Sequence, residues 1–186
     1  SKQHGILVHD AGLGKFEENE IFGSVLHGVQ VQKAGNPTFT KNRIYEGSRC
    51  GVYVFDNGQG TFEENDIFGN LLSGIEITLG GNPNFVKNRI VHDATQAGVY
   101  VHDFGQGHLE RNEILVNASA AIEIKSSANP IFLQNRIHNG KACSVFVHEG
   151  GEGILEENEI FGSQTSGVDI KTSGNPTLRH NRIYDG

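Results

Sequence analysis

The segment Phe62-Glu63-Glu64-Asn65-Asp66-Ile67-Phe68 (62–68) is the clearest copy of a unit that recurs along the whole chain. Its central asparagine returns every 23 residues, with one spacing of 24. The recurring asparagines are Asn19, Asn42, Asn65, Asn88, Asn112, Asn135, Asn158 and Asn181. An isoleucine lies two positions after each, and Phe or Leu lies three positions before each. A fixed period this short predicts a solenoid, in which each copy buries its apolar face against its neighbours.

The pattern inside one copy is that of short strands joined by tight turns. Residues 51–56 alternate between apolar and other side chains, and residues 57–60 form a glycine-rich turn. Residues 61–64 and 66–68 then predict two more strands on either side of a corner at Asn65. We therefore expect an all-β fold, a right-handed parallel β-helix of the pectin-lyase-like type with about eight coils and three strands per coil. The 186 residues are expected to form one repeat domain (1–186) that belongs to a longer chain.

Charge and cysteine usage limit the partners and the compartment. The formal net charge is −7, with acidic and basic residues interspersed, which argues against nucleic acid and against an anionic membrane surface as a partner.

Cys50 and Cys143 occupy the same position four coils apart, which is about 19 Å at a layer spacing of about 4.8 Å. A disulfide needs Cα atoms closer than about 7 Å, so we expect two free thiols. Free thiols favour an intracellular location, with secretion left open.

Stacking equivalent positions turns the sequence into vertical stripes. We expect the asparagines to point inward as a ladder that satisfies the buried corners, with Phe62, Ile67, Val52 and Val54 also facing inward. The position after each asparagine should point outward, and its charges alternate in sign along the chain. These residues are Glu20, Arg43, Asp66, Arg89, Glu113, Arg136, Glu159 and Arg182. Opposite charges on neighbouring strands stabilise the pairing and disfavour a one-coil slip.

The outward face of the first strand carries the side chains best suited to a ligand. It mixes aromatic rings with hydrogen-bonding groups, which suits sugar rings and equally suits a peptide. The candidate binding residues are Tyr53, Phe55, Glu76, Tyr100, His102, Glu123, Phe146 and His148.

This face has two interpretations, a catalytic one and a solvated one. Glu76 and Glu123 are two coils apart, about 9.6 Å, which is near the upper end of the spacing of an inverting glycosidase pair. We favour the solvated face and predict no catalytic residue, with Glu76, Glu123 and His102 as the alternative. The pairs of His with Asp or Glu recur too far apart to share one ion, so neither a metal nor a cofactor is expected.

A second outward stripe, on the third strand, is mostly large and apolar. Its candidate binding residues are Phe22, Tyr45, Phe68 and Phe161. Such a patch marks a partner surface or simply stacks along the column, and the sequence leaves both interpretations open.

Two coil types alternate, as in Gly-Val-Tyr-Val-Phe-Asp-Asn-Gly-Gln-Gly-Thr-Phe-Glu-Glu-Asn-Asp-Ile-Phe-Gly (51–69) and Gly-Gly-Asn-Pro-Asn-Phe-Val-Lys-Asn-Arg-Ile (80–90). This alternation resembles the parallel β-helix repeats, also called CASH repeats, of F-box-only proteins. The resemblance implies a right-handed β-helix that recognises substrates for a cullin-RING ubiquitin ligase. Related repeats occur in bacterial polysaccharide lyases and epimerases. The leading hypothesis is therefore a non-enzymatic scaffold that binds a protein partner. The alternative is a carbohydrate-binding or polysaccharide-active domain with a glycan ligand.

Overall fold

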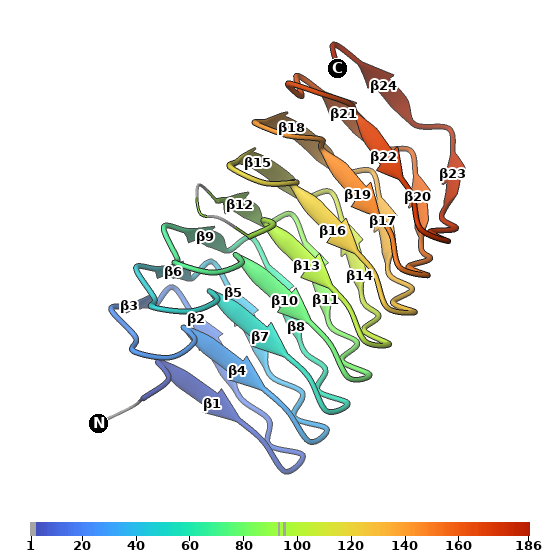
Figure 1. Cartoon of the computed structure of the whole chain (residues 1–186). Helices are drawn as coiled ribbons and strands as arrows, with labels where there is room; N and C mark the ends of the chain where they lie inside the picture. Colours follow the sequence, from blue (N-terminus) through green and yellow to red (C-terminus); the bar gives the residue numbers. More distant parts are fainter. Residues whose placement is uncertain (1–2, 93, 95) are drawn as a thin grey trace.

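The computed structural model describes residues 3–92, 94 and 96–186, without the side chains at positions 116 and 117. Within these residues the chain forms three parallel sheets of eight strands each and no helix. Figure 1 shows the coils stacked into one column, with the N- and C-termini at opposite ends. The expected β-helix of three strands per coil is confirmed, and no helix in the described part of the chain is long and apolar enough to cross a membrane.

Each sheet takes one strand from every coil. Sheet A contains β1 (Ile6–Val8), β4 (Val29–Val31), β7 (Val52–Val54), β10 (Ile75–Ile77), β13 (Val99–Val101), β16 (Ile122–Ile124), β19 (Val145–Val147) and β22 (Val168–Ile170). Sheet B contains β2 (Lys15–Glu17), β5 (Thr38–Thr40), β8 (Thr61–Glu63), β11 (Asn84–Val86), β14 (His108–Glu110), β17 (Ile131–Leu133), β20 (Ile154–Glu156) and β23 (Thr177–Arg179). Sheet C contains β3 (Glu20–Phe22), β6 (Arg43–Tyr45), β9 (Asp66–Phe68), β12 (Arg89–Val91), β15 (Glu113–Asn117), β18 (Arg136–Gly140), β21 (Glu159–Phe161) and β24 (Arg182–Tyr184).

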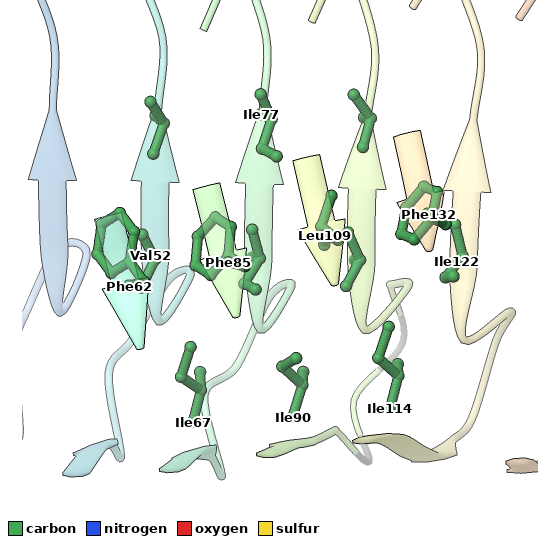
Figure 2. Close-up of a cluster of buried hydrophobic side chains, with 14 of the residues drawn as sticks. Val52, Phe62, Ile67, Ile77, Phe85, Ile90, Leu109, Ile114, Ile122 and Phe132 are labelled. Atoms are coloured by element: carbon green, nitrogen blue, oxygen red, sulfur yellow. The ribbon is translucent and has the colours of Figure 1, made fainter. Parts of the chain in front are cut away.

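The core is a set of apolar stacks between the three sheets, as Figure 2 shows. Phe62 on β8 pairs in register with Phe85 on β11, and the two rings stack with centroids 4.5 Å apart. Val52, Val54 and Ile67 from the same coil are also fully buried. The inward direction expected for these positions is confirmed, because each coil places a buried apolar side chain against the apolar residue at the equivalent position of the previous coil.

The asparagine ladder is present as expected and closes the corner between sheets B and C. The side-chain oxygen Oδ1 of Asn65 accepts hydrogen bonds from the backbone N–H and the side-chain amide of Asn42, at 2.8 and 3.0 Å. Its own amide donates to the backbone oxygen of Phe39 at 3.0 Å and to Asn88 at 2.9 Å. Since the same pattern repeats from coil to coil, the ladder satisfies polar groups that the corner would otherwise bury unpaired.

The residue before each ladder asparagine has a left-handed backbone, which the sequence did not reveal. Glu64 has φ of 55° and Lys87 has φ of 54°, and the equivalent residues in the other coils are alike. Left-handed φ is usually signalled by Gly or Asn, but these corners carry charged residues. The asparagine that follows compensates, because its side-chain hydrogen bonds hold the turn closed.

The single spacing of 24 residues lies beside sheet A. Ile67 pairs with Ile90, 23 residues later, whereas Ile75 pairs with Val99, 24 residues later. The extra residue therefore falls within positions 92–98, in the loop that leads into β13, where the structure does not describe positions 93 and 95. The regular column thus has one enlarged loop directly before Tyr100.

The alternating charges of sheet C form ion pairs along its outer face. Arg43 approaches Glu20 at 2.8 Å and Arg89 approaches Asp66 at 3.0 Å, and Arg89 also lies 3.9 Å from Glu113. The expected charge stripe is confirmed. These groups are partly exposed, so each pair contributes less than about 1 kcal/mol, and its larger effect is to fix the register.

Candidate functional site

The structure divides the sequence-predicted binding residues between two faces. Tyr53, Phe55, Glu76, Tyr100, His102, Glu123, Phe146 and His148 lie on, or directly after, five adjacent strands of sheet A. Phe22, Tyr45, Phe68 and Phe161 lie on sheet C. The two sets come from different strands of each coil and lie on different sheets.

A chain of hydrogen bonds connects three coils on the face of sheet A. The thiol of Cys50 donates to Oε2 of Glu76 at 2.9 Å, and Oε1 of Glu76 lies 3.2 Å from Nε2 of His102. Nδ1 of His102 lies 2.8 Å from Oδ2 of Asp103. The Glu76 and His102 side chains are mostly buried, whereas the Asp103 carboxylate at the end of the chain of hydrogen bonds is exposed.

These contacts shift the protonation of the groups involved. Burial acts to raise the pKa of Glu76, but hydrogen bonds from His102 and Cys50 outweigh it and lower the pKa below its ordinary value. Burial acts to lower the pKa of His102, but hydrogen bonds to Glu76 and Asp103 raise it above its ordinary value. Burial and the neighbouring Glu76 raise the pKa of the Cys50 thiol far above its usual range, so this thiol is unreactive.

A second pair of the same kind lies two coils further along. Oε1 of Glu123 is 3.1 Å from Nε2 of His148, and Nδ1 of His148 is 3.5 Å from Glu149. Each carboxylate is thus held by its own histidine. The strand β13 separates Glu76 from Glu123, and its Tyr100 pairs with both of them in register. The alternative of a catalytic pair of carboxylates stays a prediction.

Both ring nitrogens of His102 are engaged by carboxylates. The ring therefore has no free nitrogen with which to take a proton from a ligand in this arrangement. His148 is held in the same way between Glu123 and Glu149. These histidines orient the carboxylates that they contact, which suits a binding surface better than general acid–base catalysis.

The aromatic residues of sheet A are not equally covered. The ring of Tyr53 stacks with His27 at 4.5 Å and with Phe55 at 4.7 Å. The ring of Tyr100 stacks with His102 at 4.2 Å, and in the part of the chain that the structure describes no other ring stacks on it. Burial raises the pKa of Tyr53 to about 12 and also raises that of Tyr100.

A cavity of about 200 Å³ lies beside Tyr100. Its lining residues are Gln96, Ala97, Tyr100, Ser119 and Glu123. The ammonium group of Lys125 lies 5.8 Å from the centre of the Tyr100 ring, and a hydrogen bond to Tyr100 raises the pKa of Lys125. Sequence reasoning named Tyr100 and Glu123 but missed Gln96, Ala97 and Ser119. The signal that could have found Gln96 and Ala97 is the single 24-residue spacing, which enlarges the loop before β13.

The stripe on sheet C is a stack of rings. Tyr45 lies between Phe22 at 5.3 Å and Phe68 at 4.9 Å, and Phe161 stacks with Tyr184 at 5.2 Å. The guanidinium of Arg43 also lies 5.2 Å from the Tyr45 ring. Phe22 is exposed, but Tyr45, Phe68 and Phe161 are half-buried by their neighbours. This geometry favours the structural interpretation of the stripe, and its role as a partner surface stays a prediction.

One group of possible metal ligands lies elsewhere on the surface. Glu156, Glu157 and His180 bring three ligand atoms within 4.8 Å of one another. Two of the three residues are exposed, and an exposed acidic group of this kind is common without a metal. Cys50 and Cys143 are free and buried, which confirms the expected absence of a disulfide between them.

Comparison with known families identifies the class of protein. The family described as right-handed beta helix region matches residues 1–119 and 85–186, which together span the chain. The chain belongs to this family, which confirms the right-handed β-helix. A search of the curated proteins found no match.

Solved structures with the same fold include epimerases of alginate and mannuronan. A mutant of the periplasmic alginate epimerase AlgG has a TM-score of 0.84 and 13% identity, over 96% of this chain and 47% of that one. The Azotobacter vinelandii mannuronan C-5 epimerase AlgE6 A-module has a TM-score of 0.75 and 17% identity, over 95% of this chain and 56% of that one. The catalytic domain of Agl-KA has a TM-score of 0.72 and 14% identity, over 98% of this chain and 44% of that one.

At these identities the likeness shows the fold alone. This chain spans about half the length of the solved structures that it matches. The matches confirm the β-helix repeat and do not show the resemblance to F-box-only proteins.

Proposed function

We propose that this chain is the sugar-binding part of a carbohydrate-active β-helix protein. The outer face of sheet A, from β7 to β19, is the surface that takes the polysaccharide. The observation that carries this proposal is the cavity beside Tyr100, whose walls are an aromatic ring, a carboxylate, an amide and a hydroxyl. An aromatic platform with hydrogen-bonding groups at its edge is the arrangement that suits a sugar ring.

The size of the cavity agrees with a polymer rather than an isolated small molecule. Pockets that enclose a whole drug-sized ligand have about 300–1,000 Å³. A cavity of about 200 Å³ holds one ring of a longer chain. The remainder of that chain would lie over the neighbouring strands, where Glu76, Glu123 and Phe146 face outward.

We favour this proposal over a substrate-recognition module of a ubiquitin ligase. The structural neighbours carry the names of polysaccharide enzymes, and the stripe on sheet C that could take a protein partner is largely occupied by its own stacking. The free thiols of Cys50 and Cys143 do not establish an intracellular location. Burial alone protects Cys50 and Cys143 from oxidation, so two free thiols do not require a reducing compartment.

Calorimetric titration with a panel of linear oligosaccharides tests the proposal. Wild type should bind a member of the panel, and Tyr100→Ala should raise its Kd about tenfold, since tenfold corresponds to about 1.4 kcal/mol. That is close to the upper end of the roughly 0.5–1.5 kcal/mol of a well-placed aromatic contact. Phe68→Ala on sheet C is the matched control and should leave the Kd unchanged. Lack of binding to every oligosaccharide, or equal binding by Tyr100→Ala, would refute the proposal.

A further inference from the structure

The residue two positions before each strand of sheet A forms a vertical row, here called the pre-strand row. Its described members are His4, His27, Cys50, Ser73, Ala97, Ala120, Cys143 and Ser166. The backbones of this row are in register between coils. Gly5 donates its N–H to the oxygen of His27, Gly28 to that of Cys50, and Gly51 to that of Ser73.

Two of the larger members of the row, His27 and Cys50, cover the outward residue of the next coil. The ring of His27 stacks on Tyr53 at 4.5 Å, one coil further along. The thiol of Cys50 donates to Glu76, again one coil further along, at 2.9 Å. Burial lowers the pKa of His27 to about 4, so its ring is neutral near pH 7 and packs as an uncharged cover.

The same register directs Ala97 toward Glu123. A methyl group is too short to reach that carboxylate in the way that the Cys50 thiol reaches Glu76. The cavity lies at this place, between Ala97, Tyr100 and Glu123. Three successive members of the row, Ser73, Ala97 and Ala120, are small, and larger residues precede them at His27 and Cys50. Among these small members, Ala97 leaves open the place that Cys50 fills two coils earlier.

The charges around the cavity restrict what can enter it. Glu123 is its one charged wall, and both Glu123 and Glu76 act electrostatically on Tyr100. None of the described residues that line the cavity is cationic, and Lys125, which lies beside Tyr100, is engaged by that residue and lies 3.6 Å from Glu149. A sugar carboxylate would be placed against Glu123 without a free cation to compensate, which costs binding energy. A sugar hydroxyl can instead donate a hydrogen bond to the same carboxylate.

Resting on the proposed function, we infer that Ala97 opens the sugar site and that this site takes a neutral pyranose ring rather than a uronate. The sugar ring packs against Tyr100 in the cavity and donates a hydroxyl hydrogen to Glu123. Cys50 closes the equivalent place between Tyr53 and Glu76, where its thiol contacts the carboxylate.

The charge selectivity of wild type is the first test and needs no variant. The probes are cellohexaose and mannohexaose, which are neutral, and hexamers of mannuronate and galacturonate. At least one neutral hexamer should bind, with a Kd at least tenfold below that of either uronate hexamer. If a uronate hexamer binds as tightly as the neutral ones, the inference is wrong and the proposed function stands. If none of the four binds, both are wrong.

Two substitutions at Ala97 are the second test. Ala97→His places over Glu123 a ring like the one that His27 places over Tyr53, and Ala97→Cys copies the shorter Cys50–Glu76 contact. Both should weaken binding of the neutral hexamer, at least tenfold for the histidine and less for the cysteine. Ala142→His, a half-buried position outside the cavity, is the control and should bind like wild type. A folded Ala97→His that binds like wild type would overturn the inference.

A third measurement needs no sugar. Tetranitromethane should nitrate Tyr100 in wild type faster than Tyr53, because His27 and Phe55 cover the latter. His27→Ala should increase nitration of Tyr53, and Ala97→His should decrease nitration of Tyr100. Equal rates for the two tyrosines in wild type would refute the role of the pre-strand row.

Discussion

Replacement of Asn65 by alanine is the sharpest test of the ladder, because the structure shows which groups lose a partner. The Asn65 side chain makes four hydrogen bonds: two accepted from Asn42, one donated to Phe39 and one donated to Asn88. Asn65 is 1% exposed, so water cannot replace them without opening the corner.

The four bonds are not equally costly to lose. The side-chain amide of Asn42 keeps its bond to the backbone oxygen of Phe16, and Asn88 still accepts from the backbone N–H of Asn65. The backbone N–H of Asn42 and the backbone oxygen of Phe39 lose the partner that Asn65 supplied. At about 1–2 kcal/mol for each buried group left unsatisfied, the free energy of unfolding should fall by about 2–4 kcal/mol.

Denaturant unfolding of Asn65→Ala, followed by circular dichroism, measures this loss. Asn36→Ala is the matched control, because Asn36 is an exposed turn residue of the same type, and its substitution should cost less than about 0.5 kcal/mol. If the two variants unfold at the same denaturant concentration, the inward ladder does not stabilise the corner and the reasoning fails.

Two further predictions concern the core and the polar chain on sheet A. Phe62→Ala removes a fully buried ring from the aromatic stack and should lower the free energy of unfolding by about 3–5 kcal/mol, whereas a loss below about 1 kcal/mol would contradict the packing. His102→Asn should destabilise the protein more at pH 5.5 than at pH 9. The raised pKa of His102 means that its stabilisation is complete below the unfolded value of about 6.5 and is lost as the pH rises through the folded pKa. The lowered pKa of Glu76 makes its own contribution present above its unfolded pKa and lost only as the pH falls through the folded value. Denaturation midpoints at the two pH values check this, and a loss that is larger at pH 9 would reverse the assignment.

The sequence predicted the column because a solenoid converts sequence period into contact. One coil contains 23 residues, so residues 23 positions apart lie next to each other in adjacent coils. Asn65 therefore contacts Asn42 and Asn88, and Arg89 contacts Asp66. Inward and outward positions followed from alternation within each strand. Left-handed corners such as Glu64 were missed, because the hydrogen bonds of the following asparagine, rather than the residue type at the corner, stabilise that backbone.

The candidate site was predicted only in part. The residues of the sheet A face were identified from the strand pattern, but their pairing was not. Glu76 and Glu123 were expected as two related carboxylates, whereas Glu76 contacts Cys50 and His102 and Glu123 contacts His148. Such contacts depend on the direction that each side chain takes over the neighbouring coil, which strand alternation does not specify.

The repeat in the sequence by itself determined the fold, the register and the inward or outward direction of most side chains, because every coil packs only on its neighbours. The tertiary structure alone decided which parts of sheet A are covered. His27 and Ala97 occupy equivalent positions, yet one closes the space above the next coil and the other leaves a cavity. The difference depends on whether the side chain at this position is large enough to reach the residue of the next coil. It is therefore a property of packing in three dimensions.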